Sequence, residues 1–346
     1  MSNKNLSILV IGDPHFRARW IKTVDEFIRQ TLATIEARKP DVVVVLGDIL
    51  HDHEQTRESC QTRAINWFRE ISKHSYLIVL IGNHDRPNNS VFLTHEHFFN
   101  GLQDHSQILI VDDKAHATEI TKDGHVFRLV SVPYVAPHRF GEALETLKFS
   151  IEEKRPDIIF AHQEFKGSKM GAIVSEVGYD WPKDAPLMVS GHIHEYHMPQ
   201  KNMIYVGTPY QTTYAEDKNK GIYMFNIHPD RPIKLSEDVK RIKLKLRVKD
   251  SITVTATKFS KINIPESTLD LRIVVTGAQE DVTSVKQTKL YKELALLPHV
   301  KIVLRPTLDI KYSASNSAKV PYKESLYKRL GKLDESLIEY YKEIFV

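Results

Sequence analysis

Five short polar clusters in this sequence carry side chains that bind metal ions or move protons. Each cluster follows an apolar run, and each contains aspartate, asparagine or histidine. The densest is the stretch 82–85, Gly-Asn-His-Asp, which comes directly after the apolar run 76–81. A polar turn after a strand would explain one such cluster, but turns alone do not explain five clusters built in the same way. The candidate ligands are Asp13, His15, Asp48, Asn83, His162, His192 and His194.

These side chains offer two carboxylates, one amide and four imidazoles, about the set needed for two metal ions that share one carboxylate. A shell of nitrogen and oxygen without thiolate suits Mn, Fe or Zn better than Mg or Ca. Asp13 and His15 are two positions apart, so an extended backbone aims both side chains the same way. Two such ions lower the pKa of a shared water and stabilise displacement at phosphorus. We therefore expect two divalent ions, Mn²⁺ first, with Fe or Zn as alternatives.

The elements that must position these clusters are predicted to alternate between strands and helices. Apolar runs that read as buried strands end at the clusters, and they cover residues 6–11, 42–46, 76–81, 157–161 and 187–190. Amphipathic helices are predicted between the first three strands, one with an apolar stripe from Trp20 to Ile35 and one around Trp67. Shorter strands are expected over 107–111 and 127–132, and a helix over 139–154. In such α/β folds, ligands gather at the carboxyl ends of the strands.

The chain changes character after about residue 230. Residues 234–261 are rich in lysine and arginine, and the candidates for contact with DNA phosphates are Lys240, Arg241, Lys243 and Lys245. A solvated strand face explains this basic run equally well. A strand over 269–275, a helix over 282–296 and a strand over 300–304 predict a small α+β unit, and 313–318 has the composition of a linker. A helical apolar seam follows, which either docks a partner helix or packs on its own unit: Leu326, Leu330, Leu333 and Leu337.

Length and composition describe an ordinary globular protein. The chain has 346 residues, 41% of them hydrophobic, and a net charge of +4, which fits two domains, or one domain with an appendage, and an anionic partner. Cys60 is the only cysteine, so an intrachain disulfide is excluded and a reducing compartment is expected. The apolar run 6–11 is too short for a signal peptide, and no stretch approaches the length of a membrane span. We expect a soluble cytoplasmic protein.

Taken together, the five clusters resemble the motifs of the calcineurin-like metallophosphoesterases. The resemblance covers residues 6–226 and implies an α/β fold: a four-layer β-sandwich flanked by helices, followed here by a small α+β capping domain and a helical tail. It implies that the first metal is held by Asp13, His15, Asp48 and His194, and the second by Asp48, Asn83, His162 and His192, with Asp48 bridging. It also implies that His84 faces the phosphate and that Asp85 orients His84.

Further features resemble the SbcD-type nucleases of double-strand-break repair, in particular their short phage-encoded form. They are His51 after the second cluster, Gln163 after His162, and the turn at 207–210. The resemblance implies that His51 lies near the substrate phosphate and that a C-terminal segment docks an SbcC-type coiled-coil ABC ATPase. It also implies a homodimer and three parts: a nuclease domain at 1–232, a capping and DNA-contact domain at 233–312, and a linker with docking helices at 313–346.

The leading hypothesis is a Mn²⁺-dependent DNA exonuclease and endonuclease that processes ends in replication, recombination and repair, in the host cytoplasm if phage-encoded. A hydroxide between the ions would attack the phosphodiester, and His84 would assist the leaving 3′ oxygen. A phosphodiesterase or nucleotidase for small esters remains an alternative, although it would not need the second domain. A non-catalytic scaffold would not need all its ligands. Tyr134 and His138 are candidates for the border of the site, although a loop without that role is the simpler expectation.

Overall fold

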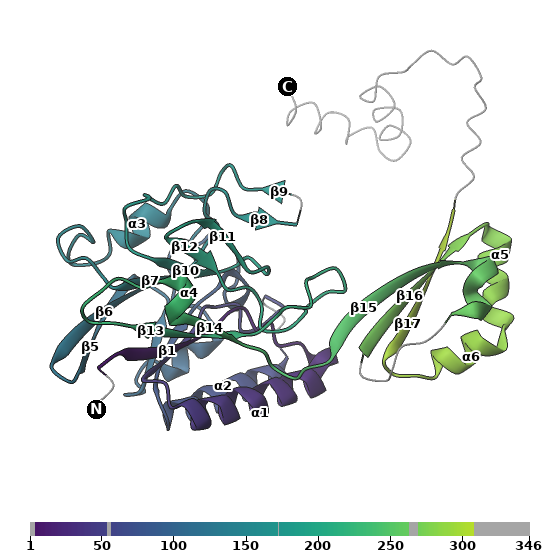
Figure 1. Ribbon diagram of the computed structural model, residues 1–346, viewed down its shortest axis with the longest axis horizontal. Coiled ribbons are helices and arrows are strands. Elements are labelled where there is room, and N and C mark those ends of the chain that lie inside the picture. The colour runs from purple at the N-terminus through teal and green to yellow at the C-terminus, as the bar shows by residue number, and fades with distance from the viewer. Residues whose placement is uncertain (1–3, 54–56, 172, 263–268, 308–346) are drawn as a thin grey trace, which may run out of the picture.

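The computed structural model describes residues 4–53, 57–171, 173–262 and 269–307 of the chain. A large lobe is built from two six-stranded sheets that pack face to face, and a smaller lobe with three strands follows it (Figure 1). The expected linker and docking helices at 313–346, including Leu326, Leu330, Leu333 and Leu337, lie outside the described residues. No helix in the described part of the chain has the length and apolarity needed to cross a bilayer.

The first sheet has the strand order β14-β13-β1-β2-β3-β4. Its four parallel strands are β1 (Leu6–Ile11), β2 (Val42–Val45), β3 (Tyr76–Leu80) and β4 (Ile108–Val111). Two antiparallel strands, β13 (Ile222–Ile227) and β14 (Val239–Ile242), complete one edge. Helices α1 (Ile21–Arg38) and α2 (Glu58–Ser72) cover its outer face, where they bury Phe27 and Trp67. The predicted strands and amphipathic helices of this half are confirmed.

The second sheet has the order β11-β12-β10-β7-β6-β5. Its strands are β5 (His116–Lys122), β6 (His125–Val132), β7 (Ile158–His162), β10 (Met188–Gly191), β11 (His197–Gln200) and β12 (Met203–Tyr205). The side chains of β1 alternate, so Ile8 and Val10 face this sheet while Leu9 and Ile11 face the helices. The outer face of the second sheet packs on α3 (Phe140–Leu144) and on Trp181, beside the hairpin of β8 (Lys169–Met170) and β9 (Ile173–Val174). The expected sandwich flanked by helices is confirmed.

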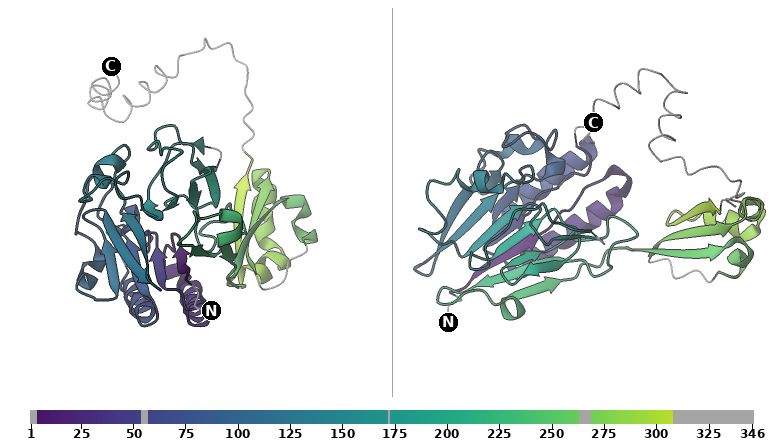
Figure 2. Two further views of the ribbon diagram at one scale, coloured as in Figure 1. Left: turned by 60° about the vertical axis from the view of Figure 1, so that its left-hand side comes forward. Right: turned by 90° about the horizontal axis from the view of Figure 1, so that it is seen from above.

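The smaller lobe has its own core. Its parallel strands are β15 (Val248–Thr255), β16 (Leu269–Gly277) and β17 (Val300–Pro306), and the short helices α5 (Gln279–Ser284) and α6 (Lys289–Ala295) connect the last two. Phe259 and Ile273 are among the residues buried between them. Figure 2 shows this lobe, coloured light green to yellow, beside the large one. The predicted helix over 282–296 is broken because Thr288 is extended and caps α6, accepting a hydrogen bond from Tyr291 N at 3.2 Å.

Two expectations from the sequence need correction, one about the domain boundary and one about a helix in the large lobe. Short helix α4 (Leu235–Asp238) leads into β14, which pairs with β13, so the predicted domain boundary at 232 falls before a strand that still belongs to the large lobe. The helix expected over 139–154 is limited to α3. It ends there because the hydroxyl of Thr146 donates to Ala143 O at 2.6 Å and accepts from Ala115 N at 2.8 Å, which ties the chain to a neighbouring segment.

Candidate metal centre

The predicted ligands come from strand ends and loops that meet at one edge of the sandwich. Three loops follow β1, β2 and β3 of the first sheet; in the second sheet His162 ends β7, and a loop follows β10. The loops pack so closely that two of their glycines leave no room for a side chain. A Cβ on Gly191 would lie 2.4 Å from Asp13 Oδ1, and a Cβ on Gly47 would lie 2.6 Å from His162 Nδ1. Glycine at these positions therefore lets the backbone of one sheet approach the ligands of the other.

Three of the ligands adopt left-handed backbone conformations that cost free energy. The φ angles are 44° for His15, 49° for Asp48 and 78° for His192. Non-glycine residues in this region cost roughly 1–3 kcal/mol each and persist where the surrounding structure holds them there. Strain at three residues of one cluster marks the cluster as a functional site.

The first ligand set lies around Asp13, which is fully buried. One carboxylate oxygen, Oδ2, accepts from His192 N at 2.8 Å, while the buried Oδ1 has no hydrogen-bond partner. The Nε2 atoms of His15 and His194 lie 3.0 Å apart, and His15 Nε2 is 3.6 Å from Asp48 Oδ2. One possible ligand atom from each of Asp13, His15 and His194 lies within 4.8 Å of the other two. An unpartnered oxygen beside two converging imidazoles is the donor set of a divalent ion.

The second ligand set lies on the other side of Asp48. Asn83 Oδ1 is 3.0 Å from His162 Nε2 and 2.9 Å from His192 Nδ1, and Asp48 Oδ1 is 3.4 Å from His162 Nε2. His162 Nδ1 donates to the carbonyl of Leu46 at 2.7 Å, so the other ring nitrogen faces the cluster. Asp48 thus has one oxygen toward each set, which is the position of a bridging carboxylate.

The charges of this cluster fit the presence of cations. Burial would lower the pKa of His162, but the carboxylates of Asp48 and Asp13 outweigh it and raise the pKa to about 9. Burial raises the pKa of Asp13 to about 6, while burial and the His162 charge lower that of His192 to about 3. The buried carboxylates of Asp13 and Asp48 need positive charge beside them, which two divalent ions would supply, so the residues present fit two ions that share Asp48.

Comparison with known proteins agrees with this geometry. The family model described as calcineurin-like phosphoesterase matches residues 6–196. This chain belongs to the calcineurin-like phosphoesterases. It is 36% identical over 287 residues to "Putative phosphoesterase 244L" of Invertebrate iridescent virus 6, a match that covers 83% of this chain and 99% of the relative. It is 35% identical over 293 residues to "Putative phosphoesterase 078R" of Invertebrate iridescent virus 3, covering 84% of this chain and 81% of the relative.

A similar solved structure is purple acid phosphatase PPD1 from yellow lupin seeds. The match has a TM-score of 0.41 and 12% identity, and it covers 65% of this chain and 50% of that one. Membership of the family rests on the sequence matches. It makes this phosphoesterase a metal-dependent hydrolase of phosphoesters, in agreement with its two histidine and aspartate clusters.

His84 of the phosphoesterase lies beside the two candidate ligand sets, and one of its ring nitrogens lies within 4.8 Å of one from His15 and one from His51. Its Nδ1 donates to the carbonyl of His51 at 2.6 Å, and its Nε2 lies 4.0 Å from Asp48 Oδ2. The ring stacks with those of His51 and His53, at centroid distances of 5.4 and 4.5 Å. Burial lowers the pKa of His84, so the imidazole is neutral near pH 7 with Nε2 available.

The expected role of Asp85 needs correction. Its carboxylate accepts hydrogen bonds from the backbone N–H groups of Ile49, Leu50 and Gly82, at 3.2, 3.0 and 3.1 Å. The orientation of His84 comes instead from the His51 carbonyl. Asp85 is buried and ties the loop after β2 to the loop after β3, because backbone N–H groups in both loops need an acceptor away from water.

Two other predicted residues border the centre and one does not. His51 Nδ1 lies 3.3 Å from His15 Nδ1, and burial together with the nearby Arg17 lowers the pKa of His51 to about 4. The Tyr134 ring lies 5.8 Å from that of His192. His138 is exposed to solvent.

Sequence reasoning missed Glu216. Its carboxylate lies 3.2 Å from His194 Nδ1, accepts from Thr212 N at 2.9 Å and pairs with Lys220 at 3.3 Å. A carboxylate behind a ligating histidine fixes the ring and raises its basicity. No local pattern marks Glu216, since it lies in an irregular loop before β13 and reaches His194 only through the fold.

A further group of histidines has a structural role. The Asp112 carboxylate accepts from His95 and His97, each at 2.8 Å, and from Gln103 at 2.7 Å. His97 Nδ1 in turn accepts from Phe99 N at 3.1 Å, so its Nε2 carries the proton that Asp112 binds. These hydrogen bonds tie the segment 95–103 to the end of β4. One possible ligand atom from each of His95, Asp112 and Asp113 also lies within 4.8 Å of the others.

The basic residues predicted to contact DNA are exposed. Lys240 and Arg241 lie on β14, and Lys243 and Lys245 lie on the connection from β14 to β15. Arg241 donates to Asn219 O at 3.1 Å. Their contact with nucleic acid stays a prediction.

Proposed function

We propose that this phosphoesterase is a nuclease that hydrolyses phosphodiester bonds of DNA, with two divalent ions, Mn²⁺ in the first place. The observation that carries the proposal is the pair of abutting ligand sets on either side of Asp48, in a chain with a separately folded second lobe. Paired ions of this kind serve in-line displacement at phosphorus. A small-ester hydrolase would have no use for the second lobe.

The ligands would be divided as the distances group them, with Asp13, His15 and His194 on one side and Asn83, His162 and His192 on the other. When bound, the two ions would lower the pKa of water and neutralise charge that develops on the phosphate. His84 would then act at the leaving oxygen. Its Nδ1 is committed to the His51 carbonyl, so Nε2, on a side chain that is 26% exposed, is the nitrogen left for the phosphate. The neutral ring has no proton there, so His84 would donate to the 3′ oxygen only as the imidazolium, the form that a neighbouring phosphate charge favours.

The proposal includes a role at DNA ends, a homodimer and an SbcC-type ABC ATPase as partner. These three parts rest on the resemblance of the motifs to SbcD-type nucleases. The segment that would dock the ATPase, 313–346, lies outside the described residues.

The test is hydrolysis by the purified full chain with MnCl₂. Substrates are end-labelled single-stranded and duplex DNA beside the small esters p-nitrophenyl phosphate, bis(p-nitrophenyl) phosphate and a cyclic nucleotide. Mn²⁺-dependent cutting of DNA supports the proposal, and the position of the label separates exonuclease from endonuclease products. Activity on the small esters alone would identify a small-molecule phosphodiesterase or nucleotidase. No hydrolysis with Mn²⁺, Fe²⁺ or Zn²⁺ would leave a non-catalytic scaffold.

A further inference from the structure

A cluster of histidine and aspartate side chains lies at the end of β4, outside both ligand sets of the metal centre. The possible ligand atoms of His95, Asp112 and Asp113 all lie within 4.8 Å of one another. His116 stands close enough for the charges of both carboxylates to act on its ring. None of these residues belongs to the sets around Asp48. The cluster is therefore a place apart from the metal centre where imidazole and carboxylate groups converge.

The fold assembles this cluster by the same rule that assembles the metal centre. Strand β4 is parallel to β1, β2 and β3, so all four end at the same edge of the sheet. Ile81 N donates to Val111 O at 3.0 Å where β3 and β4 end side by side. Asp112 and Asp113 follow β4 directly, just as the ligand loops follow β2 and β3. The carboxyl ends of parallel strands are where ligands gather in such folds.

Asp112 is held in a fixed orientation. Its side chain is 1% exposed, and Oδ2 accepts from His97 Nε2 at 2.8 Å and from Gln103 Nε2 at 2.7 Å. Its Oδ1 accepts from Asp113 N at 2.7 Å. His97 Nε2 carries a proton, because His97 Nδ1 accepts from Phe99 N, so His97 orients the carboxylate rather than binding an ion. Partners of this kind are what orient a metal-binding carboxylate.

His95 occupies the place that a cation would take. Its Nδ1 lies 2.8 Å from Asp112 Oδ2 and its Nε2 lies 3.2 Å from Asp113 Oδ2, so the ring spans the two carboxylates. Both nitrogens can donate only in the imidazolium form, and the hydrogen bond to Asp112 raises the pKa of His95. The two carboxylates therefore draw positive charge between them. A divalent ion that displaced this proton would supply more charge and gain a ring nitrogen as a ligand.

The cluster is open to solvent on one side. The side chains of His95 and Asp113 are 58% and 29% exposed, so an ion can enter from water and the imidazole can turn to meet it. The charge of Lys114 opposes a cation here, but Lys114 is exposed and salt and water screen its charge. An entry path that leads to a fixed, buried carboxylate is what a metal site needs.

The donor set indicates which ion would bind. One imidazole nitrogen and two carboxylate oxygens, with His116 as the candidate for a fourth ligand, form a mixed shell without thiolate. Such a shell suits Zn²⁺ better than Mg²⁺ or Ca²⁺. By the general order of divalent metal affinities, Zn²⁺ also binds such a site more tightly than Mn²⁺. The cluster should therefore prefer Zn²⁺ to the Mn²⁺ proposed for the metal centre.

We propose that His95, Asp112 and Asp113 form a third metal site, which takes Zn²⁺ and braces the segment 86–103 against the end of β4. The ion would join two parts of the chain that are otherwise tied by hydrogen bonds from side chains. The inference goes beyond the proposed nuclease function and stands whichever phosphoester the enzyme hydrolyses.

The segment that this ion would brace borders the metal centre. It begins directly after His84 and Asp85. Arg86 Nη1 donates to Tyr134 O at 2.8 Å, and the Tyr134 ring lies 5.8 Å from that of His192. A Zn²⁺ ion at the end of β4 would therefore stiffen one side of the metal centre without contacting the substrate.

The test counts metal ions in the full chain. Protein stripped with EDTA is dialysed against a slight excess of ZnCl₂, and zinc per chain is measured by mass spectrometry. One variant removes two ligands, His95→Gln with Asp113→Asn, and leaves Asp112 in place. The matched control makes the same changes at two exposed positions after α2 and after β13, His74→Gln with Asp230→Asn.

The wild type and the control should each hold one more Zn²⁺ per chain than the variant, and the two Mn²⁺ binding steps of the metal centre should be unchanged in the variant. Equal zinc content in wild type and variant, an equal loss in the control, or a weakened Mn²⁺ step in the variant would each overturn the inference. Should the double variant fail to fold, Asp113→Asn alone should weaken Zn²⁺ binding at this site by at least about tenfold, and an unchanged affinity would overturn the inference.

A second readout tests the bracing role. Glu96 is exposed and lies next to His95, so a glutamate-specific protease can cut after it. Zn²⁺ should slow this cut several-fold in the wild type and should have no effect on it in the variant. A cut that Zn²⁺ does not slow in the wild type would overturn the bracing role. Failure to cleave DNA with Mn²⁺ would refute the nuclease function and leave this zinc site in place.

Discussion

Replacing Glu216 by glutamine tests whether the two ligand sets are separate sites. The carboxylate lies 3.2 Å from His194 Nδ1, and it contacts no ligand of the second set among the described residues. Burial would lower the pKa of His194, but the hydrogen bond to Glu216 outweighs it and raises the pKa. Glu216→Gln keeps the size of the side chain and removes its charge, so His194 loses both its orientation and part of its basicity.

Loss of such a partner typically weakens metal binding by roughly 10–100-fold, which is about 1.4–2.8 kcal/mol at a tenfold step per 1.4 kcal/mol. We expect this loss in one of two Mn²⁺ sites. Isothermal titration of the metal-free protein with MnCl₂ would show two binding steps in the wild type. In Glu216→Gln one step should shift to weaker binding while the other keeps its affinity.

Glu195→Gln is the matched control. Glu195 pairs with the same Lys220, also at 3.3 Å, but its other oxygen accepts from Asp217 N at 3.0 Å. Glu195→Gln should therefore change the Mn²⁺ affinity of neither binding step by more than about twofold. Equal weakening of both sites by Glu216→Gln, equal weakening by the control, or no weakening at all would refute the assignment of Glu216 to His194 and the division of the ligands into two sets.

Other predictions address the remaining parts of the site and fold. His84→Gln should abolish phosphodiester cleavage while two Mn²⁺ still bind in titration, and loss of the metals in this variant would contradict its placement beside the ligands. Gly191→Ala should lose Mn²⁺ binding and lower the melting temperature, because the new Cβ would lie 2.4 Å from Asp13 Oδ1; normal binding would show that the loops can separate. Deletion of 320–346 should end co-purification with the ATPase but spare Mn²⁺-dependent cutting of single strands, and retained co-purification would argue against the docking role. Burial would raise the pKa of Asp112, but hydrogen bonds from His97 and His95 outweigh it and lower the pKa to about 2. The ionised carboxylate should therefore contribute about 1–2 kcal/mol to the free energy of unfolding above pH 4, and this contribution should disappear as the pH falls from 4 toward 2. Urea unfolding of Asp112→Asn against wild type should show a difference at pH 7 that shrinks at pH 3, and a constant difference would count against the charge as its cause.

The sequence by itself determined the first sheet and the candidate ligands that the fold then brings together. A short β-branched run such as 42–46 is typical of a parallel strand that is buried on both faces of its sheet. The polar group that follows such a run is therefore expected at the end of a strand. Asp48 and Asn83 could be named as candidate ligands because each follows such a run with a single glycine between. The sequence also placed the helical stripe from Val24 to Ile35, since its spacing of three and four residues is a local property of the chain.

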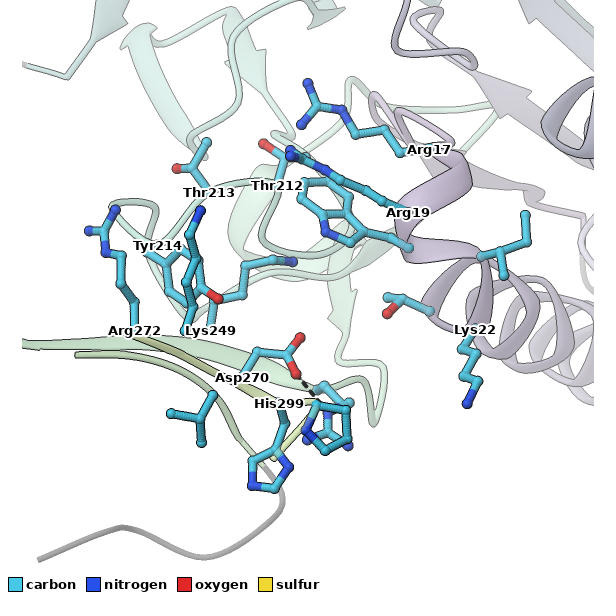
Figure 3. Close-up of a pocket in the computed structure, with 17 residues that line it drawn as sticks. Arg17, Arg19, Lys22, Thr212, Thr213, Tyr214, Lys249, Asp270, Arg272 and His299 are labelled. Carbon is cyan, nitrogen blue, oxygen red and sulfur yellow. Dashed lines mark hydrogen bonds and ion pairs between the residues drawn. The ribbon is translucent and has the colours of Figure 1, made fainter. Parts of the chain in front are cut away.

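The tertiary structure decided what lies behind and around those ligands. Glu216 reaches His194, the His51 carbonyl holds His84, and Asp85 ties two loops together, and none of these contacts follows from spacing along the chain. A pocket lined by Arg17, Lys249 and Arg272 likewise forms where the start of α1 faces the first residues of β15, β16 and β17 (Figure 3). The physical reason is range: strand and helix patterns come from neighbours within a few residues, whereas hydrogen-bond partners and charge clusters are set by segments that meet only after the two sheets and the second lobe have packed.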